Sequence, residues 1–298
     1  MTADEESDEF DRVAYRSVVP RPVTLWSGSW AVCRWTLRPL LRRWTFWILV
    51  GLGMTGFLTN FALIYIKAEI AVQNEQFAKI IDRFRVSGTG EAYRDFLFYQ
   101  ARAVELLLAY FGVAAIVGDF RAGGIQFYLS KPIDARHYAF GKLMAVGFVL
   151  ATLTLIPGLI LFFAYGLFSN SPTYWIDEWR LARGIVGYSL AIMVVEGLLL
   201  LALSCTLRRP AAWLLAWSAL FVALPALSAA LEHQFRTRWF RLGNVWWDVG
   251  MLGAMSFGSL QDQRNLLFRP WVVLTMGCLI AASVVLIRRN LRAVEAVT

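Results

Sequence analysis

The chain of 298 residues is 58% hydrophobic, well above the roughly 45–50% apolar content of an average soluble domain. Several charge-poor runs approach the ~20 residues that cross a ~30 Å hydrocarbon core. This composition excludes an ordinary soluble domain. In a membrane protein, a net charge of +8 is expected from the Lys and Arg residues that flank the spans. We therefore expect no nucleic-acid partner.

Residues 1–21 form an acidic start that is predicted to be a disordered cytosolic tail. Its first eleven residues are the reverse of the basic start of a signal peptide, because they contain Asp4, Glu5, Glu6, Asp8, Glu9 and Asp11. The first membrane span is therefore expected to act as its own insertion signal. The remainder, residues 22–298, is predicted to be a single transmembrane domain.

Residues 22–44 have the periodicity of an amphipathic helix that lies in the membrane interface. One apolar face is predicted from Trp26, Trp30, Cys33, Leu37, Leu40, Leu41 and Trp44. A basic stripe is predicted beside it from Arg34, Arg38 and Arg42. Such an elbow helix suits headgroup depth, and two interpretations stay open: contact with a cytosolic partner, or a simple membrane anchor.

Six apolar runs predict an all-α polytopic membrane protein with six transmembrane helices, at about residues 45–66, 96–118, 140–167, 185–207, 211–231 and 271–287. The second run is short unless its helix starts near Tyr93, which would leave Glu105 at the far interface. Lys142 is expected to extend its ammonium to the interface at the start of the third span. Pro157-Gly158 predicts a kink within that span.

Residues 232–269 are too polar to span a bilayer and too aromatic for a free loop. They are predicted to form short interfacial or re-entrant helices. Six spans place both termini on one side, and the short basic segments that precede or join the spans fall on that same side. The positive-inside rule makes this side cytosolic.

Motifs for catalysis are missing from the sequence. There is no phosphate-binding Gly-x-x-x-x-Gly-Lys-Ser/Thr loop, and Gly141-Lys142-Leu143 lacks both its spacing and its hydroxyl. The two histidines, His137 and His233, are not paired for a metal site. We therefore expect no enzyme activity, no metal and no cofactor bound directly.

Glu196 is the one carboxylate that falls near the middle of a predicted span, and such groups are candidate functional sites. The competing interpretation is a protonated or hydrogen-bonded glutamate that packs against Tyr188 or Ser204. A proton relay would need a second ionisable group inside the membrane, so the packed glutamate is the preferred interpretation.

Residues 119–139 separate the second and third predicted spans and combine turn signals with several cations. Gly123-Gly124 permits a sharp turn or a close backbone approach. Pro132 lacks an N–H and disfavours a helical conformation at Lys131. Asp134 occupies the position expected of an N-cap for the third span.

This segment resembles the permease subunits of type-2 ABC exporters. Their acidic residue at the end of the second span matches Asp119, and their glycine step matches Gly123-Gly124. Leu129-Ser130-Lys131-Pro132-Ile133 matches their turn, and Gly141-Lys142 matches the start of their third span. Two features depart from the family pattern: Asp134 replaces the usual serine, and the first outer segment is long.

The resemblance implies that residues 119–139 are a coupling segment that docks on a separate cytosolic ABC ATPase, which uses the ATP. The coupling residues it implies are Asp119, Arg121, Gly123, Gly124, Leu129, Pro132 and Asp134. It also implies a second permease copy, identical or related, and a bacterial inner-membrane location. A secondary transporter or channel, and a non-transporting membrane scaffold, are the alternatives.

Overall fold

The computed structural model describes residues 24–69, 88–121, 133–169, 173–259 and 263–295. Within these ranges every regular element is helical. Five helices are long and apolar enough to cross a membrane, or six if one bent pair forms a single span. This is the architecture of an all-α polytopic membrane protein. The predicted acidic tail, residues 1–21, lies outside the described residues.

The first predicted span consists of two helices, α3 (Trp44–Gly53) and α4 (Thr55–Glu69), which are bent by 42° at their junction. Gln100, from a neighbouring helix, donates its Nε2–H to the carbonyl of Gly53 at 2.7 Å. This side chain satisfies a carbonyl at the C-terminal end of α3, where a helix leaves acceptors without an intrahelical donor. The contact explains how a break is tolerated at a site where Gln100 itself is buried.

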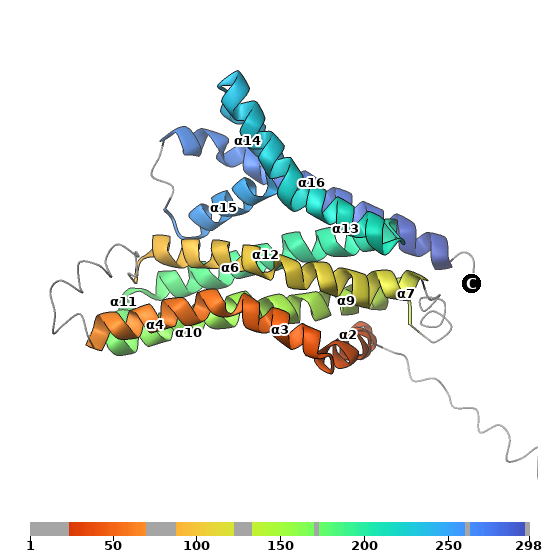
Figure 1. Ribbon diagram of the computed structural model, residues 1–298, viewed down its shortest axis with the longest axis horizontal. Helices are drawn as coiled ribbons and strands as arrows, with labels where there is room; N and C mark the ends of the chain where they lie inside the picture. The colour runs from red at the N-terminus through yellow and green to blue at the C-terminus, as the bar shows by residue number, and fades with distance from the viewer. Residues whose placement is uncertain (1–23, 70–87, 122–132, 170–172, 260–262, 296–298) are drawn as a thin grey trace, which may run out of the picture.

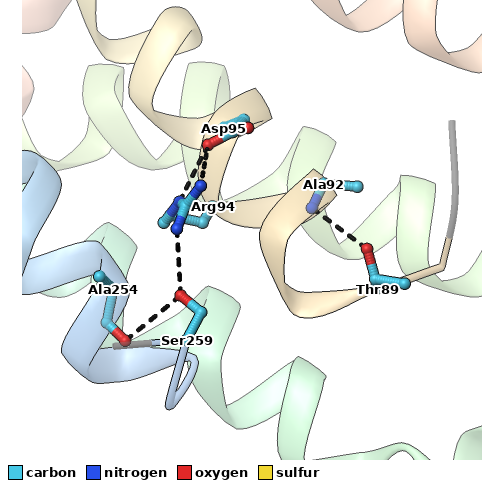
Figure 2. A network of polar contacts seen from close by, with 6 residues as sticks. All are labelled: Thr89, Ala92, Arg94, Asp95, Ala254 and Ser259. Atoms are coloured by element: carbon cyan, nitrogen blue, oxygen red, sulfur yellow. Dashed lines mark hydrogen bonds and ion pairs between the residues drawn. The ribbon is translucent and has the colours of Figure 1, made fainter. Parts of the chain in front are cut away.

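The second span is one continuous helical run, built from α6 (Gly90–Phe111), the π-helix η1 (Gly112–Val117) and α7 (Gly118–Arg121). It starts at Thr89, whose hydroxyl accepts from the N–H of Ala92 at 3.4 Å (Figure 2). Because the run extends further than residues 96–118 at both ends, Glu105 lies near its midpoint. The expectation of Glu105 at the far interface is therefore wrong.

The third span runs through α9 (Ala135–Leu150), the π-helix η2 (Ala151–Leu155) and α10 (Ile156–Phe168). The irregular turns come immediately before Pro157, which the sequence analysis singled out as a kink. Pro157 lacks the N–H that would continue the ladder of hydrogen bonds, so a local change of helix type at this point has a covalent cause.

The remaining described elements follow in chain order: α11 (Tyr174–Asp177), α12 (Trp179–Thr206), α13 (Pro210–Ser218), the π-helix η3 (Ala219–Ala223), α14 (Leu224–Phe235), the 3-10 helix η4 (Arg238–Gly243), α15 (Val245–Ser256) and α16 (Gln263–Glu295). Figure 1 shows α3–α4, α6, α9–α10 and α12 as a bundle, with α13–α14 and α16 crossing it as a second layer. In the most apolar stretch of α12, 61% of residues are buried, against 17% for the run 210–235. The core of the molecule therefore surrounds α12.

Only part of the predicted aromatic segment 232–269 forms short helices, namely η4 and α15, because residues 232–235 end α14 and residues 263–269 begin the long α16. Figure 1 shows α15 between the two layers. Asn244 caps α15 by accepting from the N–H groups of Trp246 and Trp247 at 3.0 and 3.2 Å. The buried indole of Trp246 donates to the carbonyl of Phe221, in η3, at 3.2 Å. The bond to Phe221 fastens α15 to the second layer, although α15 is too short to span a membrane.

The region predicted as an elbow helix, residues 22–44, contains the helix α2 (Leu25–Leu41), but the residues predicted for one apolar face differ in burial. Cys33, Leu37 and Leu40 are buried, whereas Trp26 and Trp30 are exposed. The reason is that α2 packs closely on α9 and presents its smaller side chains to that contact. The large indoles, which a close contact cannot accommodate, point away.

Candidate functional site

One end of the molecule collects α2, α7, the start of α9 and the end of α16 (Figure 1). Its described residues include the exposed arginines Arg34, Arg38, Arg42, Arg43, Arg121, Arg136, Arg208, Arg209, Arg288, Arg289 and Arg292. We call this the basic end. Away from this end, Arg94 pairs with Asp95 and Arg241 pairs with Glu232. Among the described residues, most of the exposed arginines therefore gather at the basic end.

At the basic end an ion pair joins the second and third spans. Lys142, from α9, is 1% exposed, and its Nζ lies 2.6 Å from Asp119 Oδ2 in α7. The same ammonium donates to the carbonyl of Ala115 at 2.6 Å. Tyr138 donates its hydroxyl to Asp119 Oδ2 at 3.3 Å, and its ring lies 5.4 Å from the lysine Nζ.

The π-helix η1 supplies one of these contacts, because Ala115 lies within it. A π-turn shifts the register of backbone hydrogen bonds, and such turns are frequent at functional sites. Here an irregular turn is found where a lysine ammonium binds a main-chain carbonyl. The expectation that Lys142 reaches the interface is wrong: the fixed acceptors of Asp119 and Ala115 offset the cost of burying its charge.

Asp134 begins α9 as the sequence predicts. Its backbone is extended (φ −81°, ψ 167°), and its N–H donates to His137 Nδ1 at 3.1 Å, as in a capping box. The start of the third span is thus defined by local hydrogen bonds. Asp119 and Asp134 therefore mark the two ends of the segment 120–133, and each has a specific partner.

Gly141 sets the distance between α2 and α9. A Cβ at this position would lie 2.6 Å from the carbonyl oxygen of Ser29 and 2.6 Å from Cβ of Val32, distances that real atoms do not adopt. The helix α2 can therefore rest on the third span only because residue 141 has no side chain. Burial against α9 also raises the pKa of the Cys33 thiol above its ordinary value.

Four of the predicted coupling residues, Gly123, Gly124, Leu129 and Pro132, lie outside the described residues. Of the others, Arg121 is exposed at the end of α7, and Asp134 is exposed at the start of α9. Arg34 and Arg38 are exposed on α2. The structure thus brings Asp119, Asp134 and the elbow helix to the same end of the bundle.

An open cleft of about 990 Å³ lies at this end. Its lining comes from α2, the start of α9, α12 and the end of α16, and includes Leu25, Asp134, Arg136, Leu198, Arg288 and Arg292. The cleft combines an apolar wall with three guanidinium groups. Nothing in the sequence pattern indicated it, because its residues come from four separate elements.

A second polar network ties the far end of the bundle to α15 (Figure 2). Arg94, in α6, binds Asp95 Oδ1 through Nε at 2.9 Å and Nη2 at 2.7 Å, and donates through Nη1 to Ser259 Oγ at 3.2 Å. The N–H of Ser259 donates to the carbonyl of Ala254 at 2.9 Å. The aromatic segment is therefore fastened where the second span starts.

Asp248, in α15, is a buried acid that the sequence analysis did not single out. It is 1% exposed, and Thr275, in α16, donates its hydroxyl to Asp248 Oδ2 at 3.2 Å. Burial raises the pKa of Asp248 to about 7, and the hydrogen bond from Thr275 partly opposes this shift.

Glu196 is fully buried in α12, and neither Tyr188 nor Ser204 donates to it. The Ser204 hydroxyl donates instead to the carbonyl of Leu200 at 2.7 Å. Glu105, in α6, is close enough to Glu196 for the two carboxyls to interact electrostatically. The structure therefore supplies the second intramembrane acid that the sequence analysis did not find.

Within the described ranges, no group of three or more His, Cys, Asp or Glu side chains is arranged to hold a metal ion. Comparison with known protein families yields no matching family model, and a sequence search of curated proteins yields no match either.

Proposed function

We propose that this chain is the membrane-spanning permease subunit of an ATP-driven exporter of the type-2 ABC family. The observation that carries the proposal is the construction around residues 120–133. Asp119 lies in the last turn of the second span, Asp134 caps the third, and Lys142 ties the two spans together. A segment anchored at both ends suits the transfer of force from a docked partner to the spans.

The one-sided arginines support a cytosolic position for the basic end, in accordance with the positive-inside rule. Both termini are then cytosolic, in a multi-pass protein of the bacterial inner membrane. The exposed Trp26 and Trp30 of α2 suit headgroup depth, beside Arg34 and Arg38. The elbow helix thus serves both as a lipid anchor and as a brace for α9.

The partners that follow are a cytosolic ABC ATPase and a second permease copy, the same or related. ATP is bound and hydrolysed by the ATPase, and this chain binds no cofactor. Closure of the ATPase would push on residues 120–133, and the Asp119–Lys142 pair would move the ends of α7 and α9 together. Rigid shifts of packed helices are an established form of such transmission. In this mechanism α15 closes the outer end of the path along which the substrate crosses the membrane.

Purification from native membranes tests the proposal. An exporter subunit should elute with an ATPase, and the complex should hydrolyse ATP. Cysteines introduced at Arg121 and Asp134, in a chain without its native cysteines, should crosslink to that ATPase. A cysteine at Thr173, exposed beside α11, is the matched control and should not crosslink. A chain that elutes without any ATP-hydrolysing subunit would argue against the proposal.

One observation favours a second candidate, a secondary transporter. That class uses ionisable groups inside the membrane, and Glu105 adds one to Glu196. A scaffold requires neither an ATPase nor buried acids. Transport driven by an ion gradient in liposomes that contain this chain alone would select the secondary transporter over both other functions.

A further inference from the structure

Glu105 and Glu196 place two carboxyl groups in the interior of the helical bundle. Glu196 is 0% exposed. Glu105 is partly exposed as a residue, but both of its carboxyl oxygens are buried. No described residue donates a hydrogen bond to any of the four oxygens. The residues lie on α6 and α12, which pack against each other.

Two cations of the packed helices, Lys142 and Arg102, are held by groups other than this pair. On α9, Lys142 binds Asp119 and Ala115. On α6, the guanidinium of Arg102 lies over the rings of Phe98 and Trp246, at 4.5 and 5.0 Å.

The other charged groups of the packed elements do not neutralise the pair either. Arg94 is held by Asp95 on α6, and α15 adds an acid, Asp248, which faces Thr275. α3, α13, η1 and η2 contain no ionisable side chain, and the one ionisable side chain of α10 is the phenol of Tyr165. The cations of α16 that lie nearest its apolar stretch, Arg269 and Arg288, flank that stretch.

Two hydrogen-bond donors lie near the pair, Trp217 and Tyr188. The indole of Trp217 lies beside Glu105 without hydrogen-bonding geometry in this structure. Tyr188 lies on α12, the same helix as Glu196. Its hydroxyl interacts electrostatically with Glu196 and has no described hydrogen-bond partner. Trp213 stacks on Trp217 with ring centroids 5.1 Å apart, and its N–H is also without a described partner.

An isolated carboxylate in an apolar interior is very costly, and two adjacent ones are costlier still. A carboxylic acid avoids that cost by keeping its proton. Indole N–H groups donate only, and therefore stabilise one remaining carboxylate rather than replace the proton. The arrangement thus suits an acid–carboxylate pair or two acids, and does not suit two carboxylates.

We propose that Glu105 and Glu196 form a proton-binding site within the membrane, whose ligand is at least one proton held by the pair at neutral pH. Loss of the last proton would leave two negative charges on the facing sides of α6 and α12. That repulsion would favour separation or hydration of this helix pair, so proton release is linked to the packing of the two helices. This inference does not depend on the proposed exporter function.

Infrared spectroscopy of the purified full chain in lipid nanodiscs tests the site. At pH 7.5 the wild type should show a carboxylic-acid C=O band that shifts in D₂O. Part of this band should be missing from the spectrum of the double variant Glu105→Gln/Glu196→Gln. The spectrum of Glu91→Gln should retain the whole band. Glu91 is an exposed acid on the same helix. Asp248 contributes equally to all three spectra and cancels.

Titration separates a coupled pair from two independent acids. The wild-type difference band should disappear in two steps as pH rises, whereas Glu105→Gln and Glu196→Gln should each titrate in one step. Identical spectra for the wild type and the double variant at pH 7.5 would overturn the proposal. So would loss of the band on addition of Na⁺ or K⁺ at constant pH, because a metal cation would then be the ligand.

A second measurement avoids the variants, in case they do not fold. Dicyclohexylcarbodiimide modifies protonated carboxyls in apolar surroundings, so wild-type protein at pH 7.5 should be labelled at Glu105 or Glu196, as mapped by mass spectrometry. Labelling confined to other acids would contradict the proposal.

Discussion

Lys142 Nζ contacts Asp119 Oδ2 and the carbonyl of Ala115, each at 2.6 Å, so a single buried ammonium holds the end of the second span against the start of the third. The two ends of the pair differ in their access to water. Lys142 is 1% exposed, whereas the Asp119 side chain is 25% exposed. This asymmetry makes the consequences of breaking the pair depend on which partner is removed.

Asp119→Ala should destabilise the protein more than Lys142→Met. Removing the acid leaves a buried ammonium without its counter-charge, which costs about 3–5 kcal/mol. Removing the lysine leaves a carboxylate that water can reach, with a smaller cost on the order of 1 kcal/mol. Thermal unfolding in detergent measures the order, and Arg121→Gln, which removes an exposed charge nearby, should unfold like the wild type. Equal losses of stability in Asp119→Ala and Lys142→Met would show that the ion pair is not buried as described.

Gly141→Ala should weaken the contact of α2 with α9, because the new Cβ would lie 2.6 Å from the backbone oxygen of Ser29. Overpacking of this kind costs about 1–3 kcal/mol. Cys33, which is 2% exposed at this contact, should then react faster with a maleimide in a chain that lacks Cys205 and Cys278. Unchanged labelling of Cys33 would contradict the close approach of the helices.

The matched control for that variant is Gly147→Ala, on the same helix. No atom lies within 4 Å of the Cβ position at Gly147. An alanine there should stabilise the helix slightly, by up to about 1 kcal/mol, because glycine loses more conformational freedom on folding. The two substitutions are chemically identical. If one lowers the stability and the other raises it, the difference comes from the neighbouring helix α2.

Gly112→Ala should be more destabilising than Gly118→Ala, although both lie in the same helical run. A Cβ at Gly112 would approach the ring of Trp213 to 2.3 Å, and Trp213 is fully buried and stacked on Trp217. At Gly118 the nearest contact is an ordinary 3.7 Å. Thermal unfolding measures the difference, and equal midpoints would argue that the tryptophan stack is not in contact with η1.

Asp248→Asn should stabilise the protein at neutral pH. Burial raises the pKa of Asp248 to about 7, above the ~3.9 of an unfolded aspartate. Between these values the unfolded chain releases the proton first, so wild-type stability falls as pH rises, by up to about 1.4 kcal/mol per pH unit. The asparagine variant lacks this loss.

The stability gained by Asp248→Asn should therefore grow from about pH 4 to pH 7 and then level off. Thermal unfolding at each pH measures it. Asp177→Asn, which alters an exposed acid at the end of α11, should follow the wild-type curve. A gain that does not change with pH would indicate that Asp248 does not titrate in this range.

Local pattern was enough to predict the helical class, a helix before the first span and the N-cap at Asp134. Each depends on neighbours in the chain: the length of an apolar run, a period of 3.6 residues, or a side chain that reaches its own backbone. The same information placed Glu105 and the ammonium of Lys142 at the membrane interface, because a charge at the edge of an apolar run is ordinarily solvated there. Glu105 could have been suspected only from its position at the start of the apolar stretch that follows it.

The sequence by itself thus determined that the chain consists of apolar helices, with a turn-rich basic segment, residues 119–139, between the second and third predicted spans. Only the tertiary structure decided that Lys142 is buried on Asp119, that the face of α2 is split between Cys33 and its tryptophans, and that Glu105 lies near Glu196. The physical reason is that these contacts join residues from different helices. Which helices meet, and how closely, depends on glycines such as Gly141 and on side-chain volumes across the interface, which no periodicity along one segment encodes.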